Sequence, residues 1–534
     1  MSPEVETPAA EEAPWKPKYN PWRIGVVVSM AAFMEILDTS IANVALPYIA
    51  GGLGASTNDS TWVLTSYLVS NAIVLPVSGW LAVRFGRKRF FMACLVVFTL
   101  SSLLCGAAPS LGILLLFRGM QGAGGGGLQP MAQAILADSF PPQQRGSAFA
   151  LYGVTAVAAP AIGPTLGGWI TFNYSWRWIF YINLPVGLLC LFAVSRLIED
   201  PPYLSRLKAA GVKLDYIGVA LLVLGIGPLQ VLLDKGQEDD WFGSHFITTL
   251  AVIATVSLIS LVIWEWFRKE PVIDVRLFRN FNYLGANVMM FTFGILLFGS
   301  LVSMPLFLQT LLGYTAELAG IVLSGGAVLV LLAMPVVGKL TTMVQARYLI
   351  AFGWLSLAVA MYYSTRRIDL LISYSSVAWL RVAQVAGQGF LFVPITMAAY
   401  IGIPVEKSNS VAGMINFMRN IGSSVGTSLV TTLVARRSQF HQARLVGNIS
   451  LDNFNFRNTA NGLTHIVTHS GLGKHDASLQ AYARIYQALQ AQAATLAYID
   501  TFMVLAVGSA IMFVLSFALK KNDPHAGGGE SAVG

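Results

Sequence analysis

Charged residues are scarce in this chain. Of its 534 residues, only 11% are charged and 55% are hydrophobic, and the mean hydropathy is +0.63. Because a soluble globular chain usually has about 25% charged residues, this composition excludes an ordinary soluble protein and predicts a polytopic membrane protein. Cysteine is also rare. Cys94, Cys105 and Cys190 all fall in apolar segments, which argues against a disulfide framework.

Motifs for nucleotide and metal chemistry are missing as well. The glycine run from Gly122 to Gly127 lacks the Lys-Ser/Thr pair of a phosphate-binding loop, so we interpret it as a site of close helix packing. The chain also has no large soluble domain, which disfavours an ATP-driven pump. All six histidines lie outside the apolar segments, and His465 and His469 lack a third ligand nearby. We therefore expect no enzyme, no metal site and no cofactor.

Long apolar segments fill most of the chain. A helix needs roughly 20 apolar residues to cross a bilayer, and fourteen segments come close to this length. They are 23–47, 61–83, 90–108, 111–137, 146–171, 178–197, 214–233, 246–267, 283–305, 317–338, 348–365, 377–400, 409–435 and 498–519. An even number of spans leaves both termini on the same side of the membrane.

The positions of Lys and Arg predict the orientation. With a cytoplasmic N-terminus, 21 of these residues lie on the cytoplasmic side and four in the short outer loops, with six more in the long outer loop 436–497. This asymmetry fits the positive-inside rule, so both termini are expected in the cytoplasm. It also accounts for the net charge of +8 without a nucleic-acid partner. No cleavable signal peptide is visible, and the polar, Pro-rich start suits a disordered tail.

An internal repeat divides the chain. Arg118-x-x-Gln121 recurs 263 residues later as Arg381-x-x-Gln384, and a Gly-x-x-x-Gly pair at 163 recurs 259 residues later at 422. Similar halves read in the same direction indicate two parallel six-helix bundles. The predicted fold is an all-α integral membrane protein with two inserted helices between the bundles. The predicted parts are a tail 1–22, a bundle 23–197, a linker with two spans 198–280, a bundle 281–519 and a tail 520–534.

Two acidic residues lie in the first apolar segment. Glu35 and Asp38 are three positions apart, so they share one face of a helix. A carboxylate inside a membrane span is costly and marks a functional site by default. Burial and a neighbouring carboxyl group both favour the neutral form, which suits such a group to carrying protons. Alternatively, Glu35 faces water at the mouth of a cavity, and Asp38 is a structural hydrogen-bond partner for Asn43 or Arg118.

Several motifs resemble one transporter family. The loop Gly79-Trp-Leu-Ala-Val-Arg84-Phe-Gly86-Arg87-Lys88 is similar to the signature loop between spans two and three of the major facilitator superfamily. Leu37-Asp38-Thr39-Ser40-Ile41-Ala42-Asn43-Val44-Ala45-Leu46-Pro47 resembles the first-span motif of its 14-span drug:proton antiporters. Gly163-Pro164-Thr165-Leu166-Gly167-Gly168 resembles their span-five antiporter motif, and the segment from Trp176 to Pro185 is also typical. The resemblance covers about 22–519 and points to EmrB-type multidrug exporters.

The resemblance implies a function and a set of partners. It implies a proton-coupled antiporter that exports hydrophobic or amphipathic compounds across the bacterial inner membrane, and Arg118 as a cation near the two carboxylates. It also implies a periplasmic adaptor and an outer-membrane channel as partners. The helical end of 436–497 is either the docking site of that adaptor or a solvated extension. The family's acidic residue in the signature loop is replaced here by Val83, so its salt bridge is absent or supplied elsewhere, for example by Asp138.

The candidate site residues fall into three groups. Proton coupling is expected at Asp38, Glu35 and Arg118. Candidates for substrate binding are the aromatic and polar residues Phe33, Asn43, Trp62, Tyr67, Asn71, Gln129, Phe291, Phe298, Gln309, Arg381 and Asn416. The gating and structural motifs are Gly79, Arg84, Gly86, Arg87, Gly163, Pro164 and Gly167. Any of the aromatic residues can instead face lipid, and any of the polar ones can hold helices together.

Three function classes remain open. The leading hypothesis is the proton-driven exporter. The second is a transporter of a single solute on the same fold. A membrane receptor or scaffold ranks last, because it would not need paired carboxylates in the middle of the membrane.

Overall fold

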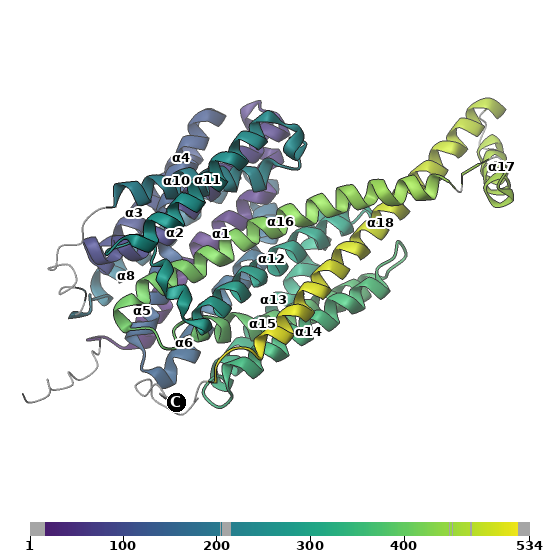
Figure 1. Ribbon diagram of the computed structural model, residues 1–534. Helices are drawn as coiled ribbons and strands as arrows, with labels where there is room; N and C mark the ends of the chain where they lie inside the picture. Colours follow the sequence, from purple (N-terminus) through teal and green to yellow (C-terminus); the bar gives the residue numbers. More distant parts are fainter. Residues whose placement is uncertain are drawn as a thin grey trace, which may run out of the picture.

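The computed structural model describes residues 17–202, 204, 215–447, 449–450, 452–469 and 473–521. These residues are mostly helical, as predicted (Figure 1). Most of the predicted tails 1–22 and 520–534, and the stretch 205–214 of the predicted linker, lie outside the described residues.

Helices account for every predicted span. The first part of the chain forms α1 (Pro21–Leu53), α2 (Thr57–Phe85), α3 (Arg87–Ala107), α4 (Leu111–Gly125), α5 (Leu128–Ser139), α6 (Arg145–Asn173), α7 (Trp178–Tyr181) and α8 (Asn183–Leu197). The inserted pair is α10 (Tyr216–Lys235) and α11 (His245–Phe267). The rest forms α12 (Phe281–Thr310), α13 (Ala316–Leu340), α14 (Ala346–Arg367), α15 (Tyr374–Ala399), α16 (Ser408–Val446), α17 (Phe454–His469) and α18 (Lys474–Ser516). Short 3₁₀ turns η1 (Pro142–Gln144), η2 (Trp241–Gly243), η3 (Val275–Arg279) and η4 (Val405–Lys407) lie between them.

Not every predicted span is a single apolar helix. Within the described residues, eleven helices are long and apolar enough to cross a membrane, or twelve when the bent α6 counts as one span. The predicted span 111–137 is divided into α4 and α5 by the glycines that follow Gly125. The predicted span 409–435 belongs to α16, which is rich in Ser, Thr, Asn and Arg. The fourteen predicted spans are therefore compatible with the structure, although two of them do not meet a strict hydropathy criterion.

The bend in α6 lies just before the Gly-Pro pair. The helix bends by 45° between Arg145–Pro160 and Ile162–Asn173, slightly ahead of Gly163 and Pro164. Because Pro164 has no N–H, the carbonyl of Pro160 loses its helical partner. The Ser40 hydroxyl of α1 donates to this carbonyl at 2.9 Å. A neighbouring helix thus satisfies the group that proline frees.

The helices pack into one continuous apolar core. Within the first part of the chain α1 packs along α6, and in the last part α12 packs along α16. The two parts meet chiefly where α6 packs against α13 and α2 against α16, and also where α5 contacts α16 and α6 contacts α15. The inserted helix α10 packs against α11, α2 and α16. It therefore lies against the seam between α2 and α16.

Two helices extend beyond the bundle. Figure 1 shows α16 and α18 running side by side out of the bundle, with α17 near their far end. The end of 436–497 is helical, as predicted, and it belongs to α18, which continues unbroken into the predicted span 498–519. The matching extension of α16 was not predicted. Asp500 of α18 holds the pair together by accepting from Arg437 at 2.6 Å and from His441 at 2.7 Å.

Candidate transport site

Both carboxylates of the first helix are buried. Glu35 and Asp38 lie near the middle of α1 and are each 2% exposed. The alternative that Glu35 faces water at a cavity mouth is therefore wrong for this structure. A buried ionisable group is tolerated only when hydrogen bonds or an opposite charge compensate for the lost water. The two carboxylates satisfy this requirement in different ways.

Asp38 is held by a cation and two amides. The Arg118 guanidinium of α4 donates to its Oδ2 at 2.7 Å, and this arginine is 0% exposed. The amides of Gln121 and Asn183 donate to Oδ1 at 3.0 and 2.7 Å. Asp38 thus joins α1 to α4 and α8. The predicted proximity of Arg118 is confirmed. The suggested partner Asn43 is exposed on α1, and the amide of Asn183 contacts Asp38 instead.

Glu35 is held by neutral donors. Its Oε1 accepts from the Tyr67 hydroxyl at 2.9 Å and from the Asn71 amide at 3.0 Å, both on α2. Its Oε2 accepts from the amide of Gln129 on α5. None of these donors carries a charge. Unlike Asp38, Glu35 therefore has no direct cationic partner among the described residues.

Tyr67 and Gly125 connect the two carboxylate sites. The Arg118 guanidinium lies 4.4 Å from the centroid of the Tyr67 ring, whose hydroxyl reaches Glu35. A Cβ added to Gly125 would lie 2.6 Å from that hydroxyl and 3.2 Å from Cγ of Glu35. Only glycine leaves room there. The interpretation of the glycine run as a packing device is therefore correct, and it serves the carboxylate site directly.

The repeat places a second buried arginine in the last part of the chain. Arg381 of α15 is 2% exposed and donates to the Ser300 hydroxyl at 3.1 Å and to Gln384 at 3.4 Å. No carboxylate lies within ion-pair distance of it among the described residues. Arg381 was predicted as a substrate contact; the structure shows it tied to α12 and to its own helix.

Polar side chains also meet across the two parts of the chain. Arg419 of α16 donates to the side-chain amide oxygen of Gln129. Next to this contact, the amide of Asn416 donates to Gln133 at 2.9 Å, and Asn420 donates to Asn71 at 3.2 Å. The predicted residues Asn71, Gln129 and Asn416 are thus all buried and hydrogen-bonded to protein in this conformation.

The other predicted substrate residues are dispersed. Phe33, Phe291 and Phe298 are partly buried against the core. Trp62 lies beneath Lys235 of α10, whose amine is 5.4 Å from the ring centroid. Gln309 is exposed near the end of α12. The structure does not bring Gln309 or Asn43 to the carboxylates, because each occupies a helix face turned away from the core.

The signature loop is stabilised as the Val83 replacement suggested. Arg87 forms a buried ion pair with Asp138 at 2.8 Å, so Asp138 supplies a carboxylate here. Gly86 has φ of 92°, a conformation that favours glycine. A Cβ on Gly79 would lie 3.0 Å from the backbone of Asn409 in α16, so this glycine permits close contact between the two parts. Arg84 is exposed.

The span-five motif packs against the first helix. A Cβ on Gly163 would lie 2.4 Å from the Ser40 hydroxyl, and one on Gly167 would lie 3.1 Å from the Ile41 side chain and backbone. These glycines let α6 approach the segment of α1 that follows Asp38. The motif therefore has a clear structural role beside any role in gating.

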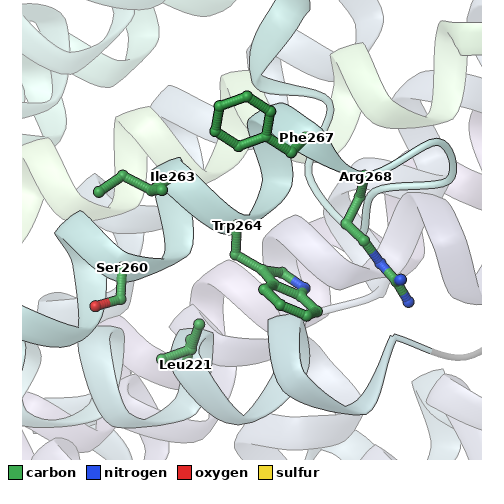
Figure 2. Close-up of a pocket in the computed structure, with 6 residues that line it drawn as sticks. All are labelled: Leu221, Ser260, Ile263, Trp264, Phe267 and Arg268. Atoms are coloured by element: carbon green, nitrogen blue, oxygen red, sulfur yellow. The ribbon is translucent and has the colours of Figure 1, made fainter.

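A surface pocket lies away from this site. Figure 2 shows it between α10 and α11, lined by Leu221, Ser260, Ile263, Trp264, Phe267 and Arg268. Ile263 and Phe267 are largely exposed on the outer face of the inserted pair. The pocket is apolar and contains none of the predicted site residues, so it is not the candidate transport site. No cluster of three or more possible metal ligands is found in the described part of the chain.

Some site residues could not be singled out from the sequence. The predicted site lacked three residues that the structure places there. Asp38 accepts from Gln121 and Asn183, and Glu35 is linked to Arg419 through the amide of Gln129. The available signal was their polarity inside apolar segments. That signal does not distinguish them from polar residues that only hold helices together, because the distinction depends on which residues face one another.

A helical membrane bundle with an internal repeat and buried carboxylates defines a class, the secondary transporters. The model of the Major Facilitator Superfamily matches residues 28–427, and the chain belongs to this family. It is a multi-pass membrane protein of a transporter family.

Comparisons with individual proteins agree with this assignment. The chain is 40% identical to the "Multidrug export protein EmrB" of Haemophilus influenzae, across 80% of this chain and 82% of that protein. It is 39% identical to the "Probable multidrug resistance protein EmrY" of Escherichia coli, across 81% and 84%. The solved proton:xylose symporter XylE matches with a TM-score of 0.60 at 13% identity, across 94% of this chain and 97% of that one, which confirms the fold alone. The predicted family resemblance is therefore confirmed.

Proposed function

We propose that the protein is a proton-coupled antiporter that exports hydrophobic or amphipathic compounds across the bacterial inner membrane, with both termini in the cytoplasm. The observation that carries the proposal is the pair of buried carboxylates on α1, each 2% exposed and each with its own hydrogen-bond partners. The names of the relatives EmrB and EmrY support multidrug export as the activity. The asymmetry in Lys and Arg supports the orientation.

The partners of the two carboxylates support different roles. Asp38 already has a fixed cationic partner, because the Arg118 guanidinium lies 2.7 Å from its carboxylate, and this geometry suits a structural ion pair between two helices. Glu35 faces only the neutral groups of Tyr67, Asn71 and Gln129, and all three can donate to either protonation state. Glu35 is therefore the proton carrier in our proposal. Asp38 and Arg118 form a constant ion pair that fixes α1 against α4.

The transport cycle follows from alternating access. A proton from outside neutralises Glu35 while the compound leaves outward, and the proton is released inward when the site faces the cytoplasm. One charge crossing about 100 mV contributes about 2.3 kcal/mol to each cycle. Asn71, Gln129 and Asn416 each contact the other part of the chain. These contacts break as the two parts separate, which exposes the three polar groups to a bound compound. Phe33, Phe291 and Phe298 supply apolar surface nearby.

The outer extension is the proposed docking site for a periplasmic adaptor, which would lead to an outer-membrane channel. Exposed apolar side chains at Phe454, Ile466, Leu479 and Tyr482 lie on α17 and α18. In our proposal these side chains provide the apolar surface that the adaptor covers. Cross-linking from a residue substituted at Leu479, in cells that contain the adaptor, would test this part separately.

Transport assays test the central proposal. Inside-out vesicles with an acidic lumen should accumulate labelled hydrophobic compounds and release protons as they do so. A panel of neutral, cationic and anionic compounds measures the breadth of transport. The alternative of a single-solute transporter predicts accumulation of one member only.

Substitution of Glu35 separates coupling from binding. Glu35→Gln keeps the size of the side chain, is permanently neutral and retains one oxygen that can accept from Tyr67 and Asn71, so labelled compound should still exchange with unlabelled compound across the membrane. Accumulation driven by the pH gradient should be lost. Accumulation that persists in Glu35→Gln, or transport by the unaltered protein without any proton flux, would reject the proposed mechanism.

A further inference from the structure

Arg419 is a buried cation without an ion-pair partner. It lies on α16, is 8% exposed, and forms no ion pair with a carboxylate among the described residues. It donates instead to the side-chain amide oxygen of Gln129 on α5, a helix from the other part of the chain. A buried charge that lacks compensation is costly. The Phe392 ring, whose centroid lies 5.6 Å from the guanidinium, gives part of this compensation, and the acidic group that Gln129 contacts next gives another part.

The direction of each hydrogen bond in this chain of groups is fixed. A guanidinium can only donate, so the oxygen of the Gln129 amide must face Arg419. The Tyr152 hydroxyl donates to the same oxygen at 3.2 Å. The amide nitrogen is then left to donate to Glu35. Gln129 thus lies with its dipole aligned between a positive group on α16 and an acidic group on α1.

This alignment depends on the charge of Glu35. When Glu35 is ionised, the amide bridges two opposite charges and both of its hydrogen bonds are strengthened. When Glu35 is neutral, the bridge has a cation at one end only. Arg419 therefore gains more from its place beside Gln129 in the ionised state, and it loses part of that gain on protonation.

We propose that Arg419 is a positioning residue that couples the proton on Glu35 to the approach of α16 and α5. By linkage, if contact between the helices favours ionised Glu35, then ionised Glu35 favours contact between the helices to the same degree. Protonation weakens the contact, so the two parts separate more readily. This inference rests on the proposed function, because it takes Glu35 as the proton carrier.

Other charged and titratable groups surround Glu35, and they do not offer the same coupling. Asp38 lies on the same helix as Glu35. Tyr67 of α2 donates to Glu35, and Arg118 of α4 lies over the Tyr67 ring and pairs with Asp38. Tyr152 of α6 reaches Glu35 through Gln129. All of these belong to the first part of the chain. Arg419 is the cation that reaches the site from α16. It is therefore the member of this set whose distance from Glu35 changes when the two parts separate.

The pH profile of transport tests the inference. In reconstituted full-length protein, Arg419→Gln removes the positive end of the bridge, so Glu35 keeps its proton to higher pH. The pH midpoint of gradient-driven transport should move by about one unit toward the alkaline side. Arg419→Lys keeps the charge and should restore most of the original midpoint. Gln129→Leu keeps both charged groups but removes the bridge, and it should move the midpoint in the same direction.

A neighbouring contact supplies the control. Gln133 lies one turn after Gln129 on α5 and also contacts α16, through Asn416. Gln133→Leu breaks a contact across the same helix pair without touching Glu35, so the pH midpoint should stay unchanged. An unchanged midpoint in Arg419→Gln would overturn the inference, as would an equal shift in Gln133→Leu. If Glu35→Gln abolishes coupling while Arg419→Gln leaves the midpoint in place, only this inference fails and the proposed function stands.

Discussion

The two arginines of the internal repeat share one kind of partner and differ in the charge of another. Arg118 and Arg381 both donate to a glutamine three residues later, at 2.8 and 3.4 Å. Arg118 also contacts the carboxylate of Asp38, whereas Arg381 contacts the hydroxyl of Ser300, which lies 262 residues after Asp38. The position 262 residues after Glu35 is the buried apolar residue Leu297.

This difference teaches that both halves of the repeat share a helix-packing scaffold, whereas the buried pair Glu35 and Asp38 lies in the first part of the chain. The same register extends to other positions: Ser102 and Ser364, again 262 residues apart, both accept a hydrogen bond from an amide of the polar cluster. The scaffold therefore does not need the carboxylates in order to form. Their presence on α1 has to be explained by a task that the last part of the chain does not perform.

The largest effect is expected from Asp38→Asn. It leaves the fully buried Arg118 without its ion-pair partner, which costs about 3–5 kcal/mol. Transport should be abolished, and the thermal unfolding midpoint in detergent should fall strongly. Both are measured on purified protein, with transport followed in vesicles.

Ser300→Ala is the matched variant in the other part of the chain. It removes one hydrogen bond to a charged group, worth about 1.5–3 kcal/mol, and leaves every carboxylate in place. Gradient-driven transport should persist at a reduced level. Equal losses of stability and transport in the two variants would contradict the expectation that the partner of Arg118 matters more than the partner of Arg381.

Most of the helical architecture could be predicted from the sequence, because long apolar segments have few alternatives in a membrane. The repeat and the acidic pair at Glu35 and Asp38 could also be found from spacing alone. The partners of each carboxylate could not. Gln121 and Asn183 reach Asp38 from α4 and α8 only because of how these helices rotate against α1. The division of the span at 111–137 depends on close contacts of glycines, which periodicity does not reveal.

Gly125→Ala should have an intermediate effect. The added methyl group would lie 2.6 Å from the Tyr67 hydroxyl and 3.2 Å from Glu35, and overpacking of this kind costs about 1–3 kcal/mol. Because the crowded groups hold Glu35, proton-coupled transport should fall more than the loss of stability explains. Unfolding midpoints and transport rates, measured on the same preparations, separate the two effects.

Two other glycines sharpen this result. Gly387, which follows Arg381 as Gly124 follows Arg118, is crowded by the backbone of α14 and not by a polar cluster, so Gly387→Ala should lower stability without a specific loss of coupling. Gly119 has open space around it on α4. Gly119→Ala should be neutral or stabilising by up to about 1 kcal/mol, since alanine favours helix. A specific loss of coupling in Gly387→Ala would contradict the assignment of proton chemistry to the first part of the chain.

The smallest effect is expected from Asp274→Asn. This variant removes a partly exposed ion pair outside the carboxylate site, which can be compared with the buried pair of Arg87 and Asp138. Burial raises the pKa of Asp274, but Lys407 and Arg276, which donate at 2.5 and 3.1 Å, outweigh it and hold the pKa below its ordinary value. Lys407 is 44% exposed, and such a pair contributes about 0–1 kcal/mol. Arg87 and Asp138, by contrast, are 2% and 5% exposed, so Asp138→Asn should cost several times more.

The sign of the pH dependence distinguishes this small contribution from a packing effect. Because the pKa of Asp274 is lower in the folded protein, its contribution is fully present above about pH 4, the ordinary range of an aspartate. It disappears as the pH falls through the folded value. The unaltered protein should therefore be slightly more stable than Asp274→Asn at pH 7, and the difference should vanish in acid. Unfolding midpoints of both proteins measured from pH 7 to pH 3 test this, and a difference that stays constant over the whole range would mean that Asp274 acts through packing.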